Sequence, residues 1–152
     1  MPESMELAPE VCGTLLRAGD AGRVAVSTPD GPHIVPLNYS VVDDALVFRT
    51  SPYSLLGTFA RNSLLAFETD YVDHELQRGW SVVARGRCQF VDDPGEIDRI
   101  RAIWSPQPWA AGARNLFLRL HWTEISGRRL GLNWNVLDEL PGRREVIGRR
   151  AP

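Results

Sequence analysis

Apolar and polar residues alternate with two different periods along this chain. Residues 7–18 place leucine and valine side chains at helical spacing, which predicts one N-terminal helix. From Arg23 onward the apolar residues recur at every second position instead, as in half-buried strands. Turn-forming residues at 29–32 and 43–44 separate the first of these runs. The pattern therefore predicts a short helix followed by an antiparallel meander.

Six segments have the composition and alternation expected of strands: residues 23–28, 33–42, 45–50, 63–70, 80–93 and 115–126. Gly86, near the middle of the longest run, indicates a bulge or a close backbone approach. Residues 71–79 are polar and are expected to form a surface loop. Short helices are expected at 51–62, capped by Ser51, and at 94–104. Helices and strands do not alternate regularly, so we predict a mainly β fold, a six-stranded antiparallel β-barrel with peripheral helices.

Length and composition are those of one globular domain. The chain has 152 residues, of which 43% are hydrophobic and 24% charged. We expect the domain to occupy residues 1–131, and residues 132–152, which show no clear period, to form a C-terminal arm or tail. No apolar run approaches the roughly 18 residues that a membrane span requires, and the first ten residues lack a signal-peptide pattern. A cytoplasmic protein without a membrane partner is therefore expected.

Charge and cysteine content narrow the possible chemistry. The formal net charge is -2, which argues against nucleic-acid binding through bulk positive charge. All 17 basic residues are arginine, so a bound anion must be held by guanidinium groups, hydroxyls or backbone N–H groups. Cys12 and Cys88 are expected to be small buried hydrophobes because two cysteines do not make a disulfide scaffold. The histidines and cysteines have no metal-ligand spacing, so no metal site is predicted.

Anion-compatible side chains are densest at Arg49, Thr50, Ser51 and Ser54. A guanidinium matches phosphate oxygens, and a helix that begins just after Ser51 would add free N–H groups. This stretch is a candidate phosphate site. The alternative, which the sequence leaves open, is that Ser51 only caps the helix and Arg49 is a solvated strand end.

The segment HIVPLN, residues 33–38, gives a second indication of a ligand. Pro36 removes a backbone donor in the middle of a strand, which is tolerated mainly at a sheet edge. A planar heteroaromatic ligand lying along that edge would find free backbone groups, and Asn38 can both donate and accept a hydrogen bond. An ordinary edge strand protected by its proline is the alternative.

The order GRVAVST, HIVPLNYSVVDDALVFRT, LLAFETD, GWSVVARGRCQFV and ISGRRL resembles the pyridoxamine 5'-phosphate oxidase-like family of FMN-binding split barrels, in particular its small actinobacterial and nitroimidazole-reductase-like members. The resemblance covers roughly residues 7–131. It implies a homodimer of split β-barrels with FMN in clefts at the subunit interface. The residues that it implies around the cofactor are Val35, Pro36, Leu37 and Asn38 along the ring, Arg49, Thr50, Ser51, Ser54 and Leu55 at the phosphate, and Trp80 and Ser81 from the partner subunit.

The chain departs from the family pattern directly after Ser54. Related proteins commonly carry one or two basic residues there, whereas this chain has Leu55 and Leu56. The resemblance implies an FMN-dependent oxidoreductase or reductase that acts on a small-molecule substrate, and the flavin would carry the redox chemistry, so no catalytic side chain is assigned. The alternatives are a degenerate flavin-binding module without catalysis, a reductase that uses F420, and, more weakly, a true pyridoxamine-phosphate oxidase.

Overall fold

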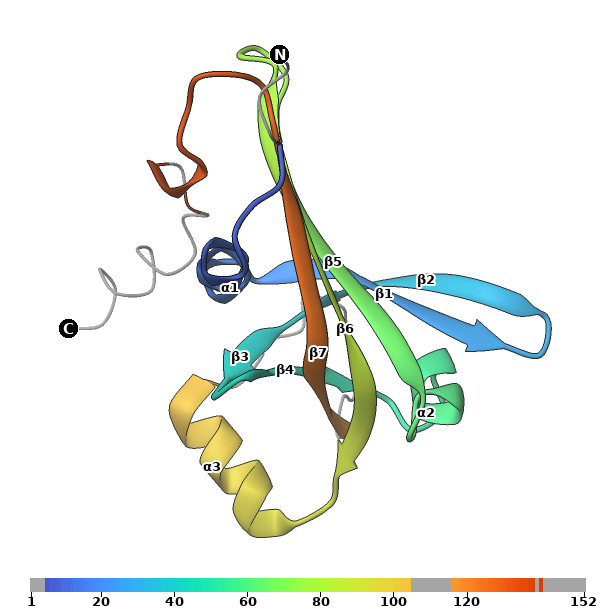
Figure 1. Cartoon of the computed structure of the whole chain (residues 1–152). Helices are drawn as coiled ribbons and strands as arrows, with labels where there is room; N and C mark the ends of the chain where they lie inside the picture. Colours follow the sequence, from blue (N-terminus) through green and yellow to red (C-terminus); the bar gives the residue numbers. More distant parts are fainter. Residues whose placement is uncertain (1–4, 105–115, 139, 141–152) are drawn as a thin grey trace.

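One curled antiparallel sheet organises the computed structural model of the protein, which describes residues 5–104, 116–138 and 140 (Figure 1). Three α-helices and a 3-10 turn accompany the sheet. In chain order the elements are α1 (Pro9–Ala18), β1 (Ala21–Thr28), β2 (Gly31–Asn38), β3 (Ser40–Val42), β4 (Ala45–Thr50), α2 (Leu55–Phe59), β5 (Leu64–Asp73), β6 (Arg78–Val91), α3 (Pro94–Trp104), β7 (Leu116–Leu130) and η1 (Val136–Asp138). None of the helices in these ranges is long and apolar enough to cross a membrane.

The strand order explains why the sheet is curled. Its seven strands run β2-β1-β5-β6-β7-β4-β3, so β2 and β3 form opposite edges. A single residue, Tyr39, separates the end of β2 from the start of β3. Two edges that are one residue apart in the chain can be joined only if the sheet folds back on itself. The predicted mainly β split-barrel fold is therefore confirmed.

The expected single strand over residues 33–42 is wrong, and this is why the structure has seven strands where six were predicted. Tyr39 turns its ring into the core, where it packs edge-on against Phe67 with ring centroids 4.7 Å apart. Its hydroxyl donates a 2.5 Å hydrogen bond to the Leu16 carbonyl of α1. The backbone bends at this anchored residue, so the chain leaves β1 and continues beside β4.

The core lies inside the curl and beneath two helices. α1 closes one side of the curl through Cys12, Leu15 and Leu16, which are fully buried. α3 covers a second, smaller cluster outside the barrel, in which Ile100 packs with Phe117 and three valines. The strands β4 and β7 thus have apolar side chains on both faces, which is typical of strands that separate two packed layers.

The hairpin β5–β6 is longer than the sequence pattern suggested. Residues 71–79 were expected to form a loop, but β5 continues through Asp73 and β6 begins at Arg78, so only four residues turn between them. Pairing between Asp73 and Arg78 extends the ladder to its tip. The bulge predicted at Gly86 is confirmed, because the β6–β7 register shifts between Arg85 and Gly86.

The described part of the C-terminal arm lies against the barrel. Trp134 donates from its indole nitrogen to the Leu130 carbonyl, and Val136 is buried in the main core cluster. Arg78 stacks on the Trp134 ring at 4.8 Å from its centroid. The predicted domain boundary at residue 131 stays a prediction, and residues 141–152 lie outside the described ranges.

Both cysteines are free and buried, as predicted. Burial raises the pKa of the Cys88 thiol from 9.0 to about 12 and also raises that of Cys12. Above pH 9 the Cys88 thiol ionises in the unfolded chain but not in the folded one. The folded state is therefore favoured most below pH 9, and stability falls as the pH rises toward 12. Because the thiolate is the reactive form, we expect fewer than about one in ten thiols to react with a chromogenic disulfide reagent at pH 8. Two thiols should react after unfolding in guanidinium, and rapid reaction of the native protein would contradict the burial.

Candidate functional site

The hydroxyls of Thr50 and Ser54 meet where β4 ends and α2 begins, beside the backbone carbonyl of Ser51. The Thr50 and Ser54 hydroxyl oxygens are 2.7 Å apart, and Ser54 also donates to the Ser51 carbonyl at 2.7 Å. Ser54 accepts a 3.0 Å hydrogen bond from the Gly57 backbone, so it is the N-cap of α2. The predicted cap, Ser51, is therefore wrong. Its carbonyl and that of Pro52 fold over Gly57, where any side chain would clash with them, and the helix can start only after this turn.

Arg49 does not join these hydroxyls. Side chains of adjacent strand residues point to opposite faces of a sheet, and Thr50 is buried on the barrel side. Arg49 lies on the other side, below α3, with its guanidinium 5.0 Å from the Phe117 ring centroid. Burial and the nearby Arg101 lower the pKa of Arg49. The four side chains predicted to form one anion site are therefore divided: the serines and the threonine lie at the start of α2, and Arg49 lies on the other face of the sheet. The role of Arg49 in cofactor binding stays a prediction.

The segment of residues 35–38 lies on an edge strand, as the position of Pro36 indicated. Within the described residues β2 pairs only with β1, which leaves its other edge unpaired. Val35 and Leu37 face inward and pack against the main core cluster, whereas Pro36 is exposed opposite Arg23. Asn38 donates from its amide to the Asp20 carbonyl at 3.2 Å, an interaction that fixes the end of the strand.

Trp80 and Ser81 occupy opposite faces of β6. The Trp80 side chain is fully buried in the main core cluster, so its ring offers no surface to a ligand or to a partner subunit. The family resemblance put Trp80 beside the flavin ring, but a fully buried side chain cannot make that contact. This large aromatic side chain instead fills the core. Ser81 lies on the outer face, in register with Asp70 and Arg128, where a partner could reach it.

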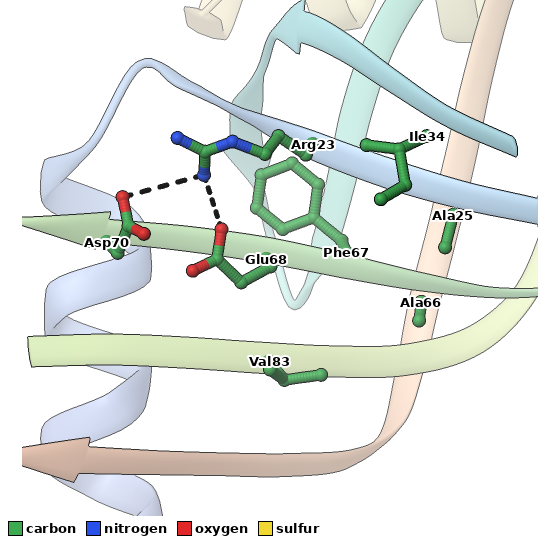
Figure 2. Close-up of a pocket in the computed structure, with 8 residues that line it drawn as sticks. All are labelled: Arg23, Ala25, Ile34, Ala66, Phe67, Glu68, Asp70 and Val83. Carbon is green, nitrogen blue, oxygen red and sulfur yellow. Dashed lines mark hydrogen bonds and ion pairs between the residues drawn. The ribbon is translucent and has the colours of Figure 1, made fainter.

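A cavity of about 450 Å³ lies on the outer face of the sheet, between β2 and β6 (Figure 2). Two alanines on neighbouring strands, Ala25 and Ala66, lie side by side in the register and leave a hollow. Ile34 on β2 and Val83 on β6 stand on either side of it, and Ile34 is 70% exposed. All of the residues that line the cavity belong to strands (Figure 2). The floor of the cavity is therefore apolar and open to a ligand.

One end of the cavity is charged. Arg23 donates from Nη1 to Glu68 at 2.5 Å and lies 3.5 Å from the Asp70 carboxylate (Figure 2). Asp70 and Glu68 raise the pKa of Arg23. Burial, together with the neighbouring Asp70, raises the pKa of Glu68 although Arg23 opposes the shift. The guanidinium is thus already engaged by two carboxylates of the same strand.

Sequence reasoning did not find this cavity. Its lining residues come from four strands. The cavity exists because the strand register makes two alanines neighbours, and the register cannot be read from one segment alone. The available signal was the pair of small residues at outward positions, Ala25 in RVAVST and Ala66 in SLLAFETD. Such a signal becomes informative only after the two strands have been paired.

The comparisons with known proteins agree with this architecture. A family model described as "Pyridoxamine 5'-phosphate oxidase" matches residues 8–129. The chain belongs to this family. An uncharacterized protein of Mycobacterium tuberculosis is 29% identical over 133 residues, which are 84% of this chain and 86% of that protein.

Two solved structures have a similar overall fold. The FAD binding protein from Mycobacterium smegmatis is 28% identical, superposes with a TM-score of 0.69, and is covered over 98% of its length by 83% of this chain. A FAD-binding protein from Mesorhizobium loti has a TM-score of 0.69 at 24% identity, covering 83% of this chain and 97% of that one. The second likeness shows the fold alone.

Leu55 and Leu56 begin α2, at the positions where the family resemblance led us to expect basic residues. The Leu56 side chain is 1% exposed in the main core cluster, and Leu55 is half-buried against it. Both side chains therefore contribute to packing, and neither supplies a cation to the turn that contains Thr50, Ser51 and Ser54. Because Ser54 donates its hydroxyl proton to the Ser51 carbonyl, Thr50 donates to Ser54, and either hydroxyl has to exchange its acceptor before it can donate to a phosphate oxygen. The unpaired edge of β2 suits a planar, largely apolar ring.

Proposed function

We propose that the protein is a flavin-dependent oxidoreductase of the pyridoxamine 5'-phosphate oxidase family that acts on a small molecule. The observation that carries this proposal is the edge of β2 that no described strand pairs with, the strand along which the family resemblance puts the flavin ring, together with an apolar cavity on the adjoining strands that a substrate could enter. Residues 35–38 would hold the ring, and Thr50, Ser51 and Ser54 would hold the phosphate. A bound flavin supplies hydride or electron transfer, which accords with the lack of an assigned catalytic side chain.

The charge at the phosphate position favours FAD over FMN. A phosphate monoester such as that of FMN carries a charge of about -1.5 to -2 at pH 7, whereas each phosphate of a dinucleotide carries one negative charge. A site to which the described residues bring hydroxyls, with Leu55 and Leu56 at the start of the helix, suits the lower charge better. The relative from M. smegmatis is named as a FAD binding protein. FMN, the expectation from the sequence, is the second candidate.

A second copy of the chain is the partner that we propose for the outer face of the sheet. Ile34 and Leu64 are 70% and 50% exposed there, and covering such side chains is favourable. Arginines and carboxylates alternate with them, as Arg85 pairs with Glu124, so the face carries both signs and can be complementary to itself. A homodimer would enclose the cavity between the two copies and leave a route to the flavin for substrate.

The visible absorption spectrum of the untagged protein, recorded before and after incubation with FAD or FMN, tests the proposal. We expect retained flavin bands, chromatography of the released cofactor that identifies FAD, and bleaching by a reduced nicotinamide followed by reoxidation. Sedimentation equilibrium should give twice the mass of the chain. A protein that rejects both flavins would overturn the proposal and leave F420 or another ligand. Retention without any turnover would leave the degenerate binding module.

A further inference from the structure

We propose that the cavity on the outer face is a substrate pocket for small organic cations, namely apolar rings or chains that carry an ammonium or a similar N–H donor. This inference rests on the proposed function in one respect, since it takes the flavin to lie along the neighbouring strand β2. It goes further by assigning the chemical class of the substrate. It also excludes phosphorylated substrates from this pocket.

The walls of the cavity fit the apolar part of such a ligand. Ala25 and Ala66 form the floor, and Ile34 and Val83 rise on either side (Figure 2). Ile34 is 70% exposed, so a ligand that covers it removes apolar surface from water. The volume of about 450 Å³ falls within the usual range for small-molecule sites.

The charged end of the cavity fits a cation. It contains one guanidinium, that of Arg23, and two carboxylates, those of Glu68 and Asp70, so its formal charge is -1 when all three are ionised. Arg23 donates to both carboxylates through the same nitrogen, Nη1. Burial and the neighbouring Asp70 raise the pKa of Glu68, and the Arg23 guanidinium opposes that shift. An ammonium group placed here would gain two carboxylate acceptors.

Other charges on the same face do not reverse this preference. Arg85 lies next to Ala66 in the register, but both oxygens of Glu124 accept from it at 3.1 and 3.2 Å. Arg128 is two strands away from Asp70, or about 10 Å at the usual strand spacing, where salt screens much of its effect. An anion entering the cavity would meet the two carboxylates first.

Calorimetric titration of the full-length protein, with its flavin content measured by absorbance in the same sample, tests this assignment. The probes are benzylamine and benzoate, which share a ring and differ in charge, and pyridoxamine with pyridoxamine 5'-phosphate, which differ only in the phosphate. We expect benzylamine to bind at least about tenfold more tightly than benzoate, and pyridoxamine to bind more tightly than its phosphate.

Matched variants locate the effect. Glu68→Gln combined with Asp70→Asn should reduce the preference for benzylamine to below about threefold, whereas Asp44→Asn, in the turn between β3 and β4 and outside the cavity, should preserve it. Ala25→Leu should abolish binding of both probes because it fills the floor. Equal binding, tighter binding of benzoate or the phosphate, or no binding by the unaltered protein would overturn the inference. A protein that rejects added FAD and FMN but still prefers benzylamine would uphold the cation pocket and overturn the proposed function.

Discussion

Gly86→Ala is expected to destabilise the protein severely, because the added methyl group would meet backbone atoms of a neighbouring strand. A Cβ at this position would lie 1.9 Å from the His121 carbonyl oxygen and 2.8 Å from the carbonyl carbon. Both atoms belong to the backbone of β7, so no side-chain rotation can relieve the contact. The strands β6 and β7 would have to separate at the bulge, at the centre of the sheet. We expect a loss of about 3 kcal/mol or more in the free energy of unfolding, at the upper end of overpacking costs.

Urea unfolding followed by tryptophan fluorescence measures this loss directly, since the midpoint should fall without a large change in slope. Gly13→Ala in α1 is the matched control. Its Cβ would approach only the flexible end of Arg17, at 3.3 Å, and alanine is favoured over glycine within a helix by about 1 kcal/mol. The control should therefore be neutral or slightly stabilising. An unchanged midpoint for Gly86→Ala would show that the bulge adapts to a side chain.

Periodicity predicted the local elements well because each depends on residues close in sequence. The alternation in residues 80–93 marked β6 correctly, and Gly86 marked its bulge, because a strand face and a missing side chain are visible in one short window. The errors arose where distant contacts decide the outcome. Tyr39 ends β2 because its hydroxyl reaches Leu16 of α1, a partner 23 residues away. Nothing in residues 33–42 alone indicates that break.

The candidate site was only partly predictable for the same reason. Clustering in sequence placed Thr50 and Ser54 together, and a turn does bring their hydroxyls, and the Ser51 carbonyl, within hydrogen-bond distance. The role of these residues in cofactor binding stays a prediction. Clustering also included Arg49, which strand alternation puts on the opposite face, over Phe117. Adjacent letters at the end of a strand are poor evidence for a shared site unless the backbone turns between them. The cavity was missed entirely because its walls come from four strands.

Leu55→Lys is expected to convert the start of α2 into a phosphate site of the kind common in the family. Leu55 follows the N-cap Ser54 and is only half-buried. A lysine at this position can therefore pack its aliphatic part against the core and extend its ammonium toward the turn that contains Thr50, Ser51 and Ser54. A charge-assisted contact contributes about 1.5–3 kcal/mol, so the Kd for FMN should fall roughly ten- to a hundredfold. FAD should gain less because its phosphates carry lower charge.

Titration of flavin fluorescence at two salt concentrations measures both affinities, and the gain for FMN should shrink at high salt if it is electrostatic. Leu55→Met, which preserves packing without adding charge, is the neutral control. Leu56→Lys should instead lower stability, because that side chain is 1% exposed and would bury an ammonium in the core. If Leu55→Lys melts normally and binds FMN no better than the unaltered protein, the phosphate does not bind at α2. The assignment of Thr50, Ser51 and Ser54 would then have to be abandoned while the cavity beside β2 is retained.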